Sequence, residues 1–169
     1  LPVIAYYGTG RLWSEHKVTK AKEKAAMDLA VQTGAYLDCL SPSSTYGHFA
    51  VWFESVVREA QNELQTGVVS PHRPQALLAA VRQAVDILLE PSGWSTIDWD
   101  FLLSEVVAVH PSHGRLPVSY LSDGIRNLIA MVADLAHRAV RLNPHLGKEA
   151  CACPGIVLID EVDMHLHPS

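Results

Sequence analysis

Two carboxylates, Asp160 and Glu161, follow directly on a run of four aliphatic residues, Ile156–Ile159. Such a run is typical of a parallel strand that is covered on both faces. Open α/β sheets bind ligands outside the carboxyl ends of their strands, so both acids are predicted at a binding edge. An Asp there can hold Mg²⁺ on a nucleotide, and the next Glu can orient or activate water. The alternative is a buried strand that merely ends in an acidic turn.

The second candidate site is the hexamer Leu121–Arg126, which opens a long helical pattern. Ser122 is a predicted N-cap and Asp123 a first-turn acid. Gly124 would let backbone N–H groups approach a ligand, and the helix dipole favours an anion such as phosphate there. A well-capped helix after a turn explains the same residues without any ligand, so this alternative stays open.

The end of the chain also offers two metal-binding alternatives. Four residues have the chemistry of zinc ligands: Cys151, Cys153, His165 and His167. The two pairs flank a strand roughly 20 Å long, which separates them too far for one tetrahedral site. An acidic cluster of Asp160, Glu161 and Asp163 could hold Mg²⁺, but it lacks the additional carboxylates or lysine of a two-metal site.

Several segments of the chain together resemble a known family. These segments are Pro2–Arg11, Leu121–Arg126, Asp134–Ala139, Leu142–Pro144 and Ile156–Pro168. They resemble ABC-class ATPases of the RecF, SMC and OLD type. More narrowly, they resemble bacterial stand-alone ATP-binding proteins of the AAA_21 type, including those described as "predicted ATP-binding protein involved in virulence". Residues 15–98 match only loosely. The resemblance implies part of a P-loop NTPase head with a helical subdomain.

The resemblance also implies a role for each matching position. Leu121–Arg126 would be the signature motif, with Ser122 and Gly124 reaching the γ-phosphate of ATP on a partner subunit. The motif would bind nucleotide through Ser122, Asp123, Gly124 and Arg126. Asp160 would be the Walker B acid on Mg²⁺, and Glu161 would polarise the attacking water. The D-loop, residues 162–167, would cross the interface of a homodimer, and its polar members are Asp163, His165 and His167.

The chain departs from the family pattern at the phosphate-binding loop. The sequence contains no G-x-x-x-x-G-K-[ST], and Gly8–Arg11 lacks the lysine and the spacing of such a loop. Asp123 and Ile125 stand where transporters usually carry Gly and Gln, which favours the RecF, SMC and OLD side. Without the lysine and its backbone cradle, this chain alone is not expected to turn ATP over. The alternative function is a non-catalytic interaction scaffold with a degenerate nucleotide site.

The elements that must hold these residues are predicted from periodicity, and they indicate the α/β class. Leu1–Tyr7 and Ile156–Ile159 are predicted to be buried parallel strands. Apolar spacings predict helices over residues 49–64, 75–89 and 123–142, and a strand pair over 101–109 and 116–120. The arginines of the last helix, Arg126, Arg138 and Arg141, are predicted to form a solvated face.

The same patterns divide the chain into four parts. These are a core strand and loop (1–14), a helical insert or lid (15–98), a hairpin with the signature helix (99–150), and the acidic strand with the D-loop (151–169). Both ends look cut through a fold, so we expect an internal piece of a larger protein. Missing neighbours would leave sheet edges and apolar surface unpaired, which predicts aggregation or a partner-dependent fold.

Composition narrows the function classes further. The 169 residues are 49% hydrophobic and 18% charged, with a net charge of −5, which argues against disorder and does not indicate nucleic-acid binding. Three cysteines form no disulfide framework and fit a reducing, cytoplasmic compartment. No apolar run approaches the roughly 20 residues that span a bilayer, so no membrane partner is expected. By analogy with the family, DNA or a nuclease or toxin protein would be a partner.

Overall fold

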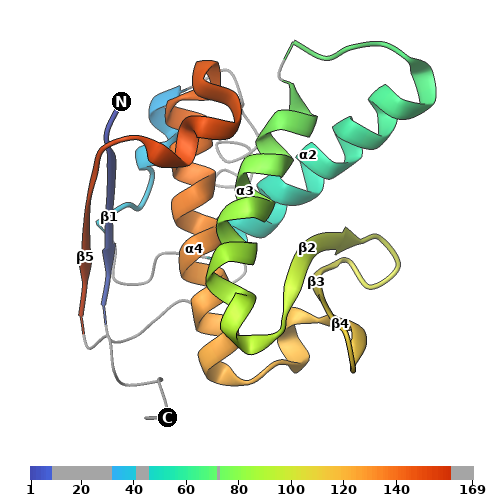
Figure 1. The fold of residues 1–169 in the computed structure, drawn as a ribbon. Helices are drawn as coiled ribbons and strands as arrows, with labels where there is room; N and C mark the ends of the chain where they lie inside the picture. The colour runs from blue at the N-terminus through green and yellow to red at the C-terminus, as the bar shows by residue number, and fades with distance from the viewer. Residues whose placement is uncertain (9–31, 41–45, 72, 161–169) are drawn as a thin grey trace.

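The computed structural model describes residues 1–8, 32–40, 46–71 and 73–160, which form a mixed α/β structure (Figure 1). Its elements follow in this order: β1 (Val3–Tyr7), η1 (Gln32–Tyr36), α2 (Tyr46–Thr66), α3 (Pro74–Leu89), η2 (Glu90–Ser92), β2 (Ser95–Asp100), β3 (Glu105–His110), β4 (Gly114–Pro117), η3 (Val118–Tyr120), α4 (Asp123–Leu142), η4 (Pro144–Ala152) and β5 (Gly155–Ile159). The predicted α/β class is confirmed, with one parallel and one antiparallel sheet among these residues.

The two ends of the described chain meet in the parallel pair β1–β5. Their register runs from Val3 opposite Gly155 to Tyr7 opposite Ile159, as the sequence predicted for two parallel strands. β1 alternates buried and half-buried side chains, because every second residue faces α4. This sheet lies on one side of α4, with α3 on the other side (Figure 1).

The predicted burial of β5 is wrong for the described residues. Ile156 and Leu158 are 64% and 57% exposed, and Val157 and Ile159 are 39% and 37% exposed. The aliphatic run forms a strand as predicted, but no described element covers its outer face. A hydrophobic run therefore identified the strand correctly without identifying what packs on it.

The helical layer forms the main core. Aromatic residues of α2, above all Phe49, Trp52 and Phe53, pack with Val81 and Val85 of α3 and are fully buried. The three predicted helices are confirmed. The helix over 123–142 has the predicted bounds, and the other two begin one to three residues earlier than predicted.

The antiparallel sheet differs from the predicted strand pair. Its order is β2-β3-β4, and β2 was missed, whereas residues 101–104 form a turn instead of a strand. The Asp100 carboxylate accepts the backbone N–H groups of Leu102 and Leu103 at 3.0 and 3.1 Å, which ends β2. Ser104 then takes a left-handed φ of 53°. The second predicted strand, 116–120, is only partly correct because Val118–Tyr120 is a 3-10 turn.

Candidate functional site

The acidic end of β5 lies where the sequence placed it, at the carboxyl edge of the parallel pair. The backbone N–H of Asp160 donates to the carbonyl oxygen of Tyr7 at 2.9 Å, so the ladder continues one residue beyond β5. Asp160 is exposed. Glu161 and the three polar residues of the predicted D-loop, Asp163, His165 and His167, lie outside the described residues.

The predicted N-cap residue occupies its expected position at the start of α4. Ser122 has extended backbone angles (φ −61°, ψ 154°), and its carbonyl accepts the N–H of Arg126 at 2.9 Å. Its hydroxyl makes no capping hydrogen bond, so the stabilising role proposed in the ligand-free alternative is not seen. The exposed hydroxyl and the first-turn N–H groups around Gly124 thus face outward at a helix N-terminus.

Charges in the first turn of α4 partly neutralise one another. The guanidinium of Arg126 pairs with the carboxylate of Asp123 and also donates to the carbonyl of Ser119 at 3.2 Å. Asp123 is largely exposed, so its negative charge would oppose a phosphate unless Arg126 offsets it. The pair therefore keeps the N-terminus of α4 compatible with an anion.

The two candidate motifs lie on different elements, Asp160 directly after β5 and Ser122 directly before α4. The phenol of Tyr7 contacts Asp134 in the middle of α4, and Ser122 lies about 18 Å from Asp134 along the helix axis. The N-terminus of α4 and the carboxyl ends of β1 and β5 point to the same end of the molecule (Figure 1). One copy therefore presents both candidate motifs toward one end.

A buried polar network connects β1, α4 and η1. The phenol of Tyr7 donates to Asp134 Oδ2 at 2.8 Å, and Arg138 Nε donates to the same oxygen at 2.9 Å. Arg138 also donates to the carbonyls of Ala35 and Leu37 at 2.6 and 3.0 Å. Tyr7, Asp134, Arg138 and Ala35 are buried, and Leu37 is half-buried, so these charge-assisted hydrogen bonds are largely shielded from water and therefore strong.

The network corrects the prediction that the arginines of this helix form a solvated face. Arg138 and Arg141 are only 3% and 7% exposed, and Arg126 is half-buried. Burial alone would lower the pKa of Arg138, but the adjacent Asp134 carboxylate outweighs it and raises that pKa. The available sequence signal was an acid and a base at i and i+4 on a helix rich in alanine, where small side chains let other elements approach closely.

The exposed carboxylate of Asp160 is compatible with Mg²⁺, whereas the zinc alternative involves His165 and His167, which lie outside the described residues. Magnesium is commonly held by one or two carboxylates together with phosphate oxygens and water, so one exposed Asp at a strand end is compatible with it. Cys151 and Cys153 are free thiols. No group of three or more His, Cys, Asp or Glu side chains among the described residues is placed to hold a metal ion.

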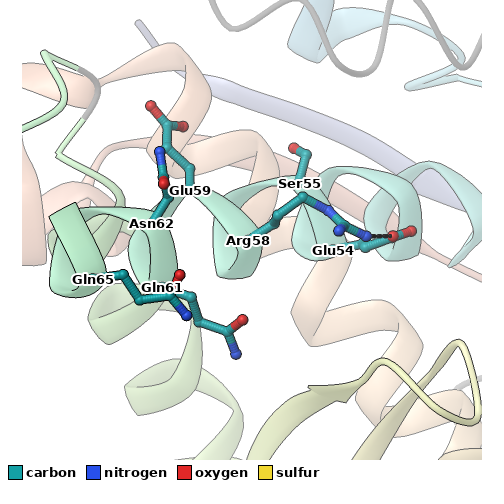
Figure 2. Close-up of a pocket in the computed structure, with 7 residues that line it drawn as sticks. All are labelled: Glu54, Ser55, Arg58, Glu59, Gln61, Asn62 and Gln65. Atoms are coloured by element: carbon teal, nitrogen blue, oxygen red, sulfur yellow. Dashed lines mark hydrogen bonds and ion pairs between the residues drawn. The ribbon is translucent and has the colours of Figure 1, made fainter.

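A recess of about 690 Å³ lies elsewhere, on the polar face of α2 (Figure 2). Its lining residues are Glu54, Ser55, Arg58, Glu59, Gln61, Asn62 and Gln65. All seven come from one helix, and Arg58 is already paired with Glu54 at 2.7 Å. It is therefore the groove surface of a single helix and not a cleft between elements that would enclose a nucleotide.

Comparison with known proteins relates part of the chain to probable ATPases. No protein-family model matches. A stretch of 54 residues is 56% identical to the Retron Vc95 probable ATPase of Vibrio cholerae serotype O1 biovar El Tor, covering 32% of this chain and 10% of that protein. A stretch of 61 residues is 48% identical to the Retron Ec83 probable ATPase of Escherichia coli, covering 36% of this chain and 11% of that protein. The matched stretches thus span about a tenth of either relative.

A membrane location has no support from the helices. In the described part of the chain, none of them combines the length and the apolar character needed to cross a bilayer.

Proposed function

We propose that this chain is part of an ABC-type ATPase head that binds and hydrolyses ATP with Mg²⁺ as a homodimer. The observation that carries the proposal is the parallel pair β1–β5, which holds Asp160 at its carboxyl edge on the same side as the N-terminus of α4 (Figure 1). The partial similarity to probable ATPases supports the same reading. The narrower assignment, to the AAA_21 type and its virulence-associated members, remains part of the proposal.

Each candidate residue has a chemical role in this proposal. Asp160 and Glu161 are the catalytic pair: Asp160 ligates Mg²⁺, and Glu161 accepts a hydrogen bond from the attacking water and aligns it with the γ-phosphate. Bound Mg²⁺ would neutralise charge on the phosphate oxygens. Ser122 and Gly124, with Asp123 and Arg126 beside them, offer hydroxyl and N–H donors to the γ-phosphate on the other subunit.

In the proposed dimer, the two motifs of different subunits meet on one nucleotide, as the resemblance implies. Asp134, the α4 residue that the phenol of Tyr7 contacts, lies about 18 Å along the helix axis from Ser122. Two copies facing each other would complete two sites, and residues 162–167 would cross their interface. ATP would then join the heads, and hydrolysis would release them as a conformational switch.

The proposal needs residues beyond this chain. The sequence contains no lysine-bearing phosphate loop, so the full-length protein that includes these residues must supply one. Attached elements moved by the switch, and a DNA, nuclease or toxin partner, belong to that larger protein and are part of the proposal only.

The decisive experiment measures ATP hydrolysis by the full-length protein beside Glu161→Gln. We expect turnover that falls about 10²- to 10³-fold in Glu161→Gln, because the water loses its polarising group, while ATP traps this variant as a dimer on size-exclusion chromatography. Glu149→Gln, the same change at an exposed acid of η4, is the matched control and should behave as wild type.

A mixing experiment tests whether the site is shared between subunits. Ser122→Arg and Glu161→Gln chains should each be inactive alone, yet their mixture should recover part of the turnover, since one site of each mixed dimer carries neither change. A wild-type protein without turnover, or an unchanged rate in Glu161→Gln, would contradict the ATPase proposal and favour an interaction scaffold. Failure of the mixture alone would contradict only the shared site.

A further inference from the structure

Tyr7 makes one hydrogen bond through its backbone, to Asp160 of the proposed site, and another through its side chain, to the middle of α4. Its backbone carbonyl accepts the N–H of Asp160 at 2.9 Å, and its phenol donates to the carboxylate of Asp134 at 2.8 Å. The side chain is 1% exposed. One residue at the end of β1 therefore connects the acid-bearing edge of β5 to the middle of α4, the helix whose first turn carries Ser122.

The carboxylate of Asp134, which accepts the hydrogen bond from the phenol of Tyr7, is held in place by a second donor. Asp134 is 1% exposed and also accepts from Arg138, which donates to two carbonyls of the η1 region, those of Ala35 and Leu37. Burial, followed by the Asp134 charge, raises the pKa of Tyr7 far above its ordinary value, so the phenol stays protonated and remains a donor. The phenol therefore remains available as the donor of this hydrogen bond.

The neighbouring tyrosines lack this double connection. Tyr6 points to the opposite face of β1, because successive strand residues alternate, and its backbone N–H donates to the carbonyl of Cys39 at 2.7 Å. Tyr36 donates its phenol to the carbonyl of Pro2 at 2.6 Å, at the other end of β1 from Asp160. Variants of Tyr6 and Tyr36 therefore serve as controls for the loss of the Tyr7 phenol.

We propose that Tyr7 is a positioning residue that sets Asp160 relative to α4 and so couples the two candidate motifs within each subunit. The inference rests on the proposed ATPase function. A helix transmits an axial displacement along its length, so a shift at Asp134 also moves Ser122 and Gly124. Since a misplacement of about 1 Å can cost on the order of a hundredfold in rate, one hydrogen bond at this junction is sufficient to affect turnover.

The test is Tyr7→Phe in the full-length protein, with Tyr6→Phe and Tyr36→Phe as matched controls. We expect kcat to fall roughly tenfold in Tyr7→Phe, while the KM for ATP changes less than about twofold, because a phosphate loop outside this chain would bind the ground state. Tyr36→Phe removes an exposed phenol-to-carbonyl hydrogen bond, whereas the hydrogen bond of Tyr7 is buried, so the urea midpoint of each variant is measured beside its kcat to separate lost stability from lost positioning.

Amide hydrogen exchange supplies a readout that does not depend on turnover. The Asp160 N–H should exchange faster in Tyr7→Phe than in Tyr36→Phe, since only the first change loosens the residue whose carbonyl it bonds. Turnover in wild type, together with unchanged kcat and unchanged Asp160 exchange in Tyr7→Phe, would overturn the positioning role alone. Absence of turnover in wild type would overturn the ATPase proposal and this inference with it.

Discussion

His137 shows how strongly a single side chain depends on its surroundings. Its ring lies 4.6 Å from that of Trp52, centroid to centroid, and neither of its nitrogens has a hydrogen-bond partner among the described residues. Burial, together with the charges of Arg141 and Arg138 and the imidazole of His48, lowers its pKa well below the ordinary 6.5. The folded protein therefore keeps this imidazole neutral, at the cost of two unsatisfied ring nitrogens.

Acid is expected to destabilise the protein through His137. The pKa of His137 is lower in the folded protein than in the unfolded chain. As the pH falls through about 6.5, the unfolded chain therefore binds a proton at this residue, whereas the folded protein does not. This contribution to stability is complete above that pH and is lost as the pH falls, by at most about 1.4 kcal/mol per pH unit. His137→Leu, a neutral residue of similar volume, should flatten the dependence of the urea midpoint on pH between about 7.5 and 5.5.

The control for this prediction is His145→Leu, which changes an exposed histidine and should keep the wild-type slope. Equal slopes in wild type and His137→Leu would show that groups other than His137 carry the acid sensitivity.

At the scale of elements, the pairing of β1 with β5 depends on the close approach of their first residues. Gly155 lies opposite Val3, and a Cβ built on Gly155 would meet the Val3 carbonyl oxygen at 2.9 Å and the Val3 Cβ at 3.2 Å. The N–H of Val3 also donates to the carbonyl of Pro154 at 2.9 Å. A backbone oxygen cannot move aside as a flexible side chain can, so this position admits only glycine without a shift of the strand.

Gly155→Ala should therefore displace the start of β5. We expect a net loss of about 1–2 kcal/mol in the free energy of unfolding, because the steric cost exceeds the gain from a less flexible unfolded chain. Amide exchange along β5 should also increase. Gly67→Ala is the comparison: its Cβ meets no atom within 4 Å, so that change incurs only the cost of a left-handed backbone (φ 70°) and should leave exchange in β5 unaltered. Normal protection of β5 in Gly155→Ala would refute the steric argument.

At the scale of the whole molecule, the described residues leave one sheet face uncovered. α4 partly covers the inner side of β5, whereas Ile156 and Leu158 on the outer side remain mostly exposed. A two-stranded sheet is only marginally stable by itself, and an apolar strand at its edge can pair with another chain. The exposed face is therefore the strongest candidate surface for self-association among the described residues.

Replacing this outer face should reduce association of the 169-residue chain. The double variant Ile156→Thr, Leu158→Thr places a β-branched residue suited to a strand at both positions, so we expect a smaller hydrodynamic size at high concentration by light scattering, with little loss of stability. The matched control is Leu102→Thr, Leu103→Thr, which removes two exposed leucines from a turn that has no strand edge. Equal effects of the two double variants would indicate general hydrophobicity and not the edge of β5.

The sequence by itself determined the features whose signals are local. The bounds of α4 followed from Ser122 before the helix and Asn143-Pro144 after it, and the aliphatic run of β5 predicted a strand with an acid at its carboxyl end. The position of Ser122 at the helix start was likewise predictable. The functional roles of these residues remain predictions, because their chemistry needs a partner subunit and residues beyond those described.

Only the tertiary structure decided which residues meet across the chain. The hydrogen bond between Tyr7 and Asp134 joins residues 127 positions apart, so no local pattern indicated it. The i, i+4 spacing of Asp134 and Arg138 was compatible with an ion pair, but the burial of Arg138 depends on contacts with η1. Likewise, the exposure of β5 reflects which elements pack against it, whereas hydrophobicity reports only the preference for burial. Local propensities select elements, but contacts between distant segments decide which polar groups are buried, paired and able to act together.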